Sequence, residues 1–189
     1  MRWFLFLAAL ALSVPAAPAM AQETDHAAIA AQQAAMKKIG WMFGVWRGPG
    51  SGVTRAGPYQ VTQTERIGPM LDGTVIVLEG KGYNADGSVG FNAFAVISYD
   101  VPTGRYLMRS YALGHQGDFE LKLTGTGYIW EIPAGPGAII RYTMTLKDGV
   151  WHEVGDYIAP GQPPRRVVEM NLKRVGDTDW PLAGSIPPK

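Results

Sequence analysis

Aromatic and polar side chains that alternate along short extended segments are the residues of this sequence best suited to contact a small molecule. Small-molecule sites combine an apolar lining with a few polar groups that fix the orientation of the ligand. On segments with strand periodicity, such side chains reach the same face at every second position. Six residues are therefore predicted to line a ligand cavity: Arg109, Tyr111, Trp130, Tyr142, Met144 and His152.

No catalytic constellation accompanies these residues. His152 and Glu153 begin a His-Glu-x-x-His zinc motif, but Asp156 stands where the second His belongs, and the segment alternates like a strand rather than a helix. The sequence also lacks the Gly-x-Ser-x-Gly pentad of a nucleophile elbow. We therefore predict no catalytic residue, no metal site and no cofactor.

Three alternatives stay open beside ligand binding, and one of them is an interaction or structural protein that uses the outer face of the fold, which a large exposed apolar patch would favour. An isomerase or hydrolase would use His152, Asp156 or a buried carboxyl such as Glu65 to move protons, provided that two titratable groups meet in one pocket. A haem-binding barrel would use His152 as its iron ligand, and the haem absorption would then depend on that residue.

The glycine-rich segment Gly48–Gly52 is a poor candidate for a phosphate-binding loop. Such loops need a helix N-terminus behind them, whereas a strand pattern follows here, and Pro49 removes one backbone donor. We interpret the segment as a flexible or bulged first strand.

Composition excludes several other classes of protein. The 189 residues contain no cysteine, which excludes a disulfide scaffold, thiolate metal sites and a cysteine nucleophile. The chain has 17 Lys and Arg against 16 Asp and Glu, and one of those bases is Arg2, so the rest of the chain is neutral. Because the chain has no basic run, we do not expect nucleic acid as a partner. The expected partner is a small hydrophobic ligand.

Residues 1–21 have the pattern of a secretory signal peptide. Arg2 precedes an apolar run of about a dozen residues, and Ala19-Met20-Ala21 supplies small residues around a cleavage site. The run is too short to cross a bilayer, which needs about 20 apolar residues. We expect cleavage after Ala21, a periplasmic or secreted location, and no membrane span in the mature chain.

One helix is expected near the new N-terminus, within residues 22–40. Thr24 can cap it, and Lys37 and Lys38 lie at the negative end of its dipole. Its apolar stripe is thin and rich in alanine, so we expect it to cover another element. The proline-containing residues 177–189 are expected to form a loose C-terminal tail.

Between residues 41 and 176 the hydrophobic period changes to two, which indicates strands with one apolar face. Turn residues separate about ten such segments: 45–55, 58–67, 73–84, 89–100, 104–112, 117–123, 126–133, 138–147, 150–158 and 165–175. No gap can hold a crossover helix, so consecutive strands must be antiparallel neighbours. Closure into a barrel removes the exposed edges. The sequence predicts an all-β fold, an up-and-down antiparallel barrel of about ten strands with one N-terminal helix.

Two positions resemble the calycin arrangement of lipocalins and fatty-acid-binding proteins. Trp46 lies in a Gly-x-Trp context at the start of the first strand, and Arg174 ends the last strand. The resemblance implies a structural role for both, with the Arg174 guanidinium stacked on the Trp46 ring over the closed end of the barrel.

A second resemblance covers residues 40–175. The segments Gly44–Gly48, Tyr99–Tyr106 and Glu169–Arg174 resemble the G-x-W-x-G start, Y-D-x-x-T-x-x-Y hairpin and E-M-x-L-x-R closing strand of a bacterial family of lipocalin-like domains of unknown function. That family implies a fold and no activity. More distantly, the same class includes nitrobindin-like haem barrels.

Overall fold

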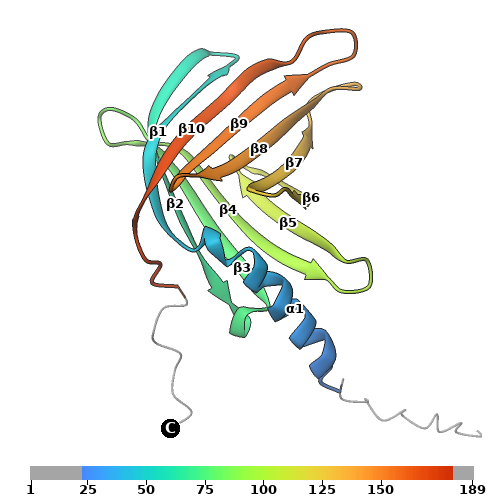
Figure 1. Ribbon diagram of the computed structural model, residues 1–189. Helices are drawn as coiled ribbons and strands as arrows, with labels where there is room; N and C mark the ends of the chain where they lie inside the picture. Colours follow the sequence, from blue (N-terminus) through green and yellow to red (C-terminus); the bar gives the residue numbers. More distant parts are fainter. Residues whose placement is uncertain (1–22, 181–189) are drawn as a thin grey trace, which may run out of the picture.

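The computed structural model describes residues 23–180, which form ten antiparallel strands and one α-helix (Figure 1). The predicted signal peptide, residues 1–21, lies outside the described residues. The strands are β1 (Gly44–Thr54), β2 (Gly57–Met70), β3 (Val75–Tyr83), β4 (Val89–Asp100), β5 (Arg105–Ala112), β6 (His115–Leu123), β7 (Gly127–Pro133), β8 (Ile139–Lys147), β9 (Val150–Ile158) and β10 (Arg165–Gly176). Each strand matches one predicted segment, so the all-β prediction is confirmed.

The sheet closes on itself. Each strand is hydrogen-bonded to its neighbours in sequence, and β10 returns to pair with β1, beside which it lies in Figure 1. At this seam Trp46 lies opposite Arg174, and Gly50 lies opposite Met170. Closure gives each of the described strands a hydrogen-bonded neighbour on both sides.

Helix α1 (His26–Lys38) and the short 3₁₀ helix η1 (Gly40–Met42) cover one end of the barrel (Figure 1). Helix α1 packs against β3, β4 and the short 3₁₀ helix η2 (Leu71–Gly73). Met36, Ile39 and Met42 are at most 2% exposed and belong to the main hydrophobic cluster of the barrel. The expectation that this helix covers another element is correct, because its few large apolar side chains fill the end of the barrel.

The N-cap of α1 lies one residue later than predicted. Asp25, not Thr24, is the N-cap, and its carboxylate accepts a hydrogen bond from the backbone N–H of Ala28 at 2.8 Å.

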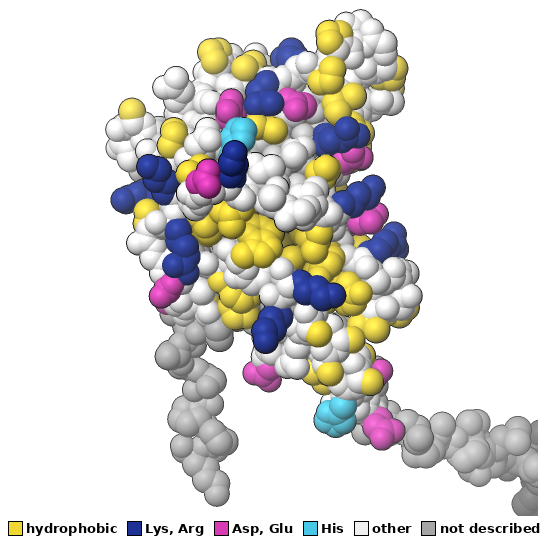
Figure 2. Space-filling view, viewed as in Figure 1, with side chains coloured by type: hydrophobic (Ala, Val, Ile, Leu, Met, Phe, Trp, Pro, Cys, Tyr) yellow, Lys and Arg dark blue, Asp and Glu magenta, His cyan; other side chains and the backbone are white. Residues whose placement is uncertain are grey.

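Figure 2 shows hydrophobic side chains gathered in the middle of one face, with charged side chains around them. Within residues 23–180, no helix has the length and apolar character needed to cross a membrane.

The barrel wall is weakest between β6 and β7. These strands pair only at Lys122 with Ile129 and at Leu123 with Tyr128, next to the turn that joins them. Every other neighbouring pair is joined over at least six residue pairs. Beyond these two residue pairs, β6 and β7 are not joined by a hydrogen-bonded ladder.

The first residues of the expected loose tail are held against the barrel. Asp177 accepts a hydrogen bond from Arg174 at 2.6 Å, and Asp179 forms an ion pair with Arg66 on β2 at 3.2 Å. The Arg66 guanidinium also lies over the Trp180 ring, 5.6 Å from its centroid. Residues 177–180 thus extend the contacts of β10.

Candidate ligand-binding site

The register of the strands determines which predicted ligand residues reach the interior. On β8, Met144 is fully buried, and Tyr142 points to the same side two residues earlier. Trp130 on β7 lies opposite Tyr142, and the two rings stack with their centroids 4.3 Å apart and their planes 11° apart. The structure therefore brings three predicted residues together inside the barrel: Trp130, Tyr142 and Met144.

Arg109 and Tyr111 lie on the outer face, so the prediction that they face the interior is wrong. On β5 the buried Met108 faces inward, and the two flanking odd positions must then face outward. Arg109 forms an exposed ion pair with Asp118 at 2.9 Å and donates a hydrogen bond to the Tyr111 hydroxyl at 2.9 Å. Tyr111 lines an external pocket of about 460 Å³ together with Phe94.

His152 also lies on the outer face. Its neighbours Trp151 and Glu153 point inward, whereas its ring Nε2 lies 3.1 Å from Oε1 of Glu169 and its side chain is 41% exposed. Asp156 shares this outer face. A His–carboxylate pair for catalysis is therefore not inside the barrel, and His152 is not placed to hold a haem iron there.

Trp46 and Arg174 are neighbours in the sheet, but the stacking implied by the resemblance is not among the cation–π contacts of the described residues. The Trp46 ring is 2% exposed, and its Nε1 donates a hydrogen bond to the Met42 carbonyl at 2.9 Å. Arg174 instead donates to the Phe43 carbonyl and to Asp177. Carbonyl and carboxylate oxygens hold the guanidinium away from the indole.

Glu153 is the centre of a hydrogen-bonded aromatic cluster inside the barrel. Its carboxylate accepts hydrogen bonds from the Tyr128 hydroxyl at 3.1 Å, from Trp130 Nε1 at 3.3 Å and from Trp151 Nε1 at 3.1 Å. Glu153 is 5% exposed. Burial raises the pKa of Glu153, and the three donors oppose this shift because they stabilise the charged form.

A second buried carboxyl belongs to Glu65 on β2. It is 6% exposed, and its Oε1 accepts a hydrogen bond from Gln63 Nε2 at 2.8 Å. Its Oε2 has no hydrogen-bond partner among the described residues. A Cβ on Gly80 of β3 would lie 2.8 Å from both carboxylate oxygens, so glycine at that position leaves the space that the carboxylate occupies.

The surroundings of Glu65 favour its protonated form. Burial raises the pKa of Glu65 to about 8, the hydrogen bond from Gln63 lowers it, and the negative charges of Glu153 and Glu79 raise it further. Burial, and then Glu153, raises the pKa of Tyr142 to about 12. At neutral pH both Glu65 and Tyr142 are therefore neutral and can donate a proton to a hydrogen bond.

Helix α1 covers one end of the barrel interior, and no helix among residues 23–180 covers the other, which we call the open end. Ile67, Trp151 and Leu172 are at most 1% exposed near the closed end. Inward-facing side chains on the far halves of the strands keep intermediate exposure: Tyr59, Phe91, Ser110, Ile132, Tyr157 and Val168. Because these side chains point into the barrel, solvent reaches them through its open end.

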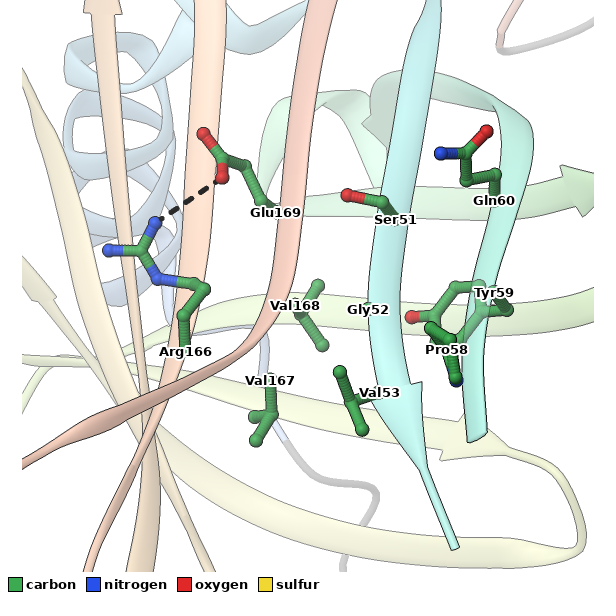
Figure 3. Close-up of a pocket in the computed structure, with 10 residues that line it drawn as sticks. All are labelled: Ser51, Gly52, Val53, Pro58, Tyr59, Gln60, Arg166, Val167, Val168 and Glu169. Carbon is green, nitrogen blue, oxygen red and sulfur yellow. Dashed lines mark ion pairs between the residues drawn. The ribbon is translucent and has the colours of Figure 1, made fainter. Parts of the chain in front are cut away.

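A pocket of about 450 Å³ lies at this open end, where β1 ends and β10 begins. Figure 3 shows the side chains of β1, β2 and β10 that line it. The Tyr59 hydroxyl lies 2.6 Å from where a Cβ on Gly52 would be, so the ring covers a stretch of β1 that has no side chain. The ion pair between Arg166 and Glu169, at 3.5 Å, lies at the margin of the pocket.

From the sequence, Glu153 and Gln63 were not predicted to face the interior, and Glu65 was considered only for catalysis. The reason is visible on β9, where Val154 shares a face with His152 while Trp151 shares the other face with Glu153. Apolar residues on both faces leave the inward direction undecided from that strand alone. The partner strand β8 settles it, because Met144 lies directly opposite Glu153.

Comparison with known proteins adds support for the fold. No model of a protein family and no curated protein matches this chain. Among solved structures, the chain is similar to the crystal structure of Rv2717c from M. tuberculosis, at 14% sequence identity and a TM-score of 0.56, over 74% of this chain and 96% of that chain. At this identity the likeness concerns the fold alone.

The fold and the interior site together define a class. The protein is a closed ten-stranded antiparallel β-barrel with a single helix, consistent with a lipocalin-like or calycin-like fold. The narrower bacterial family suggested by the three sequence motifs stays a prediction.

Proposed function

We propose that this protein binds a small apolar or amphipathic molecule inside its barrel. The proposal rests on a difference in solvent exposure between the two halves of the barrel interior. Aromatic and aliphatic side chains near the open end keep solvent exposure, whereas the polar groups Gln63, Glu65 and Glu153 are buried deeper. An apolar lining with few polar groups is the usual composition of a small-molecule site.

A substitution that fills the interior tests this proposal. Ser110 faces inward on β5, where it pairs with Ala95 and Gly117, and the Phe119 ring lies against Gly117. Ser110→Trp should weaken binding of an uncharged fluorescent apolar probe such as N-phenyl-1-naphthylamine at least about tenfold, since a filled cavity loses most of the buried ligand surface. Arg109→Trp places the same side chain on the outer face of the same strand and should leave the affinity unchanged.

Two outcomes of the probe titration would overturn the proposal. One is equal probe binding by Ser110→Trp and the unchanged protein, and the other is no binding by the unchanged protein. Native mass spectrometry and lipid extraction of protein purified from its source then identify the natural ligand. A protein that always emerges empty would also contradict the proposal.

We also propose that the protein acts outside the cytoplasm. Support comes from the charged, apolar and small-residue pattern of residues 1–21. Cell fractionation after expression of the full chain, with N-terminal sequencing of the product, should give exported protein that begins at Gln22. Retention of Met1 on a cytoplasmic product would contradict this.

A catalytic function is the second candidate, and it now depends on Glu65. A carboxyl with a pKa of about 8 next to another buried carboxyl is the kind of group that donates protons in acid–base catalysis. Chemical conversion of the natural ligand by the unchanged protein, and not by Glu65→Gln, would favour this candidate.

A further inference from the structure

The closed half of the barrel holds buried acids without a buried base. The buried polar side chains among the described residues are Gln63, Glu65 and Glu153, and no Lys, Arg or His is buried with them. Buried carboxylates normally occur with a cationic partner or with a full set of hydrogen bonds. Glu153 has such a set, and Glu65 does not.

Glu65 is the carboxyl whose hydrogen bonding is incomplete. Its single donor is Gln63, and its free Oε2 is enclosed by the barrel. The strands beside it add no positive charge on the inside. Trp46 on β1 and Gly80 on β3 are its direct neighbours, while Lys81 faces outward and is paired with Glu79 at 2.8 Å.

Aromatic rings enclose the region of the two carboxyls. The centroids of Trp46 and Trp151 are 5.6 Å apart, and those of Tyr128 and Trp151 are 5.9 Å apart. Trp46 pairs with Glu65 in the sheet, and both Tyr128 and Trp151 donate hydrogen bonds to Glu153. Electron-rich ring faces together with carboxylates form the environment in which proteins bind ammonium groups.

We propose that Glu65, Gln63 and Glu153 bind the ammonium head of an amphipathic amine, whose hydrocarbon tail extends toward the open end of the barrel. The proposal rests on the proposed function, since it names the class of ligand that the same interior takes. An N–H of the head group supplies the donor that Oε2 of Glu65 lacks. The positive charge compensates the two acids, and the apolar residues of the open half surround the tail.

Binding of such a ligand is coupled to a proton. Besides the amine, the titratable groups that act on Glu65 are Glu153, Glu79 and Tyr128. All three carry negative or no charge, so an ammonium group is the charge that favours ionised Glu65. The proton of the Glu65 carboxyl leaves to solvent as the ammonium binds, and the head group itself keeps its three hydrogens.

Isothermal titration calorimetry with three ligands of equal chain length tests the head group. Decylammonium should bind at least about tenfold more tightly than decanol at pH 8, and decanoate should bind most weakly. Between pH 6 and pH 8 the affinity for decylammonium should rise, by up to about tenfold per pH unit, while the affinity for decanol stays constant. Titrations in two buffers of different ionisation enthalpy should show release of a proton at pH 7.

Glu65→Gln removes the charge at nearly constant shape. This variant should lose the preference for decylammonium over decanol. Glu120→Gln, on the exposed outer face of β6, is the matched control and should keep that preference.

The outcomes separate the two proposals. Equal binding of decylammonium and decanol by the unchanged protein would overturn the ammonium site and leave ligand binding intact. Binding of none of the three ligands would overturn both proposals. If Glu65→Gln does not fold, the test is made on the unchanged protein alone. Absence of proton release, or of a pH-dependent affinity for decylammonium, would then overturn the ammonium site.

Discussion

The Glu153 carboxylate accepts a hydrogen bond from the indole of Trp151, two residues earlier on the same strand, at 3.1 Å. Residues two apart on a strand share a face, so β9 places an aromatic donor and a carboxylate side by side without help from a loop. Tyr128 and Trp130 complete the cluster from β7. The interior thus contains a polar centre that is built entirely from strand positions.

Replacing this carboxylate should destabilise the barrel. Glu153→Gln puts an amide N–H₂ among three hydrogen-bond donors, and at least one buried donor loses its acceptor. The free energy of unfolding should fall by about 1–3 kcal/mol. Urea denaturation followed by tryptophan fluorescence measures it. Glu131→Gln, which affects only an exposed ion pair with Arg141, should cost at most about 1 kcal/mol, and an equal loss in both variants would contradict the prediction.

The stability of the protein should decrease as pH rises from about 5 to 8. Folded Glu65 keeps its proton up to a pKa of about 8, whereas the unfolded chain releases it near the ordinary value of 4.5. Between these values the native state binds more protons, so the free energy of unfolding falls with pH, by at most about 1.4 kcal/mol per unit. Urea midpoints at several pH values should show this slope.

Glu65→Gln should remove the part of that slope that Glu65 contributes, because an amide does not titrate in this range, and a slope that remains belongs to Glu153, whose pKa burial also raises. Glu120→Gln should retain it. A slope that is the same in Glu65→Gln as in the unchanged protein would assign the effect to another group.

Gly80→Ala should disturb the Glu65 carboxyl directly. The new Cβ would lie 2.8 Å from both carboxylate oxygens, and the side chain must move within a closed interior. We expect a loss of about 1–3 kcal/mol in the free energy of unfolding. At Gly176 a Cβ would meet nothing within 4 Å, so Gly176→Ala should be neutral or slightly stabilising. Thermal unfolding by circular dichroism compares the two, and equal melting temperatures would refute the prediction.

Tyr106→Phe should loosen α1. The hydroxyl donates to the Ala35 carbonyl at 2.9 Å and joins β5 to the helix. Its loss should cost about 1 kcal/mol and speed hydrogen exchange of the helix amides more than that of the strands. Tyr99 packs edge-on against Tyr106, with ring centroids 5.1 Å apart, so Tyr99→Phe is a matched control that should leave α1 exchange unchanged. Uniform acceleration in Tyr106→Phe would show that the contact does not act locally.

The sequence predicted the number and order of the strands because turn residues and period-two alternation are local signals. Side-chain direction was predicted correctly where only one face of a strand is apolar, as on β8, where Tyr142 and Met144 alternate with Arg141 and Thr143. It was wrong on β5, where Tyr111 makes the outer face resemble an inner one. The face of such a strand is decided by pairing with distant strands, which local alternation does not encode.

The candidate site was predicted less completely for the same physical reason. Trp130, Tyr142 and Met144 were predicted to face inward because large apolar groups that alternate along a strand indicate its buried face, and the structure places them inside. A buried carboxyl gives the opposite local signal, since acids are mostly exposed. Glu65 and Glu153 are enclosed only when the barrel closes. Most of the hydrogen-bond donors to Glu153 come from another strand, β7, and local sequence does not reveal them.

The glycines of β1 have a consequence for how the chain reaches its native state. A Cβ on Gly48 or on Gly52 would collide with the carbonyl oxygens of Asn171 and Val167, so these positions let the backbones of β1 and β10 approach closely. The partners are more than a hundred residues apart in sequence, and such distant pairing is slow to form. The barrel therefore closes late in folding, and until then the edges of β1 and β10 are exposed to pairing with other chains.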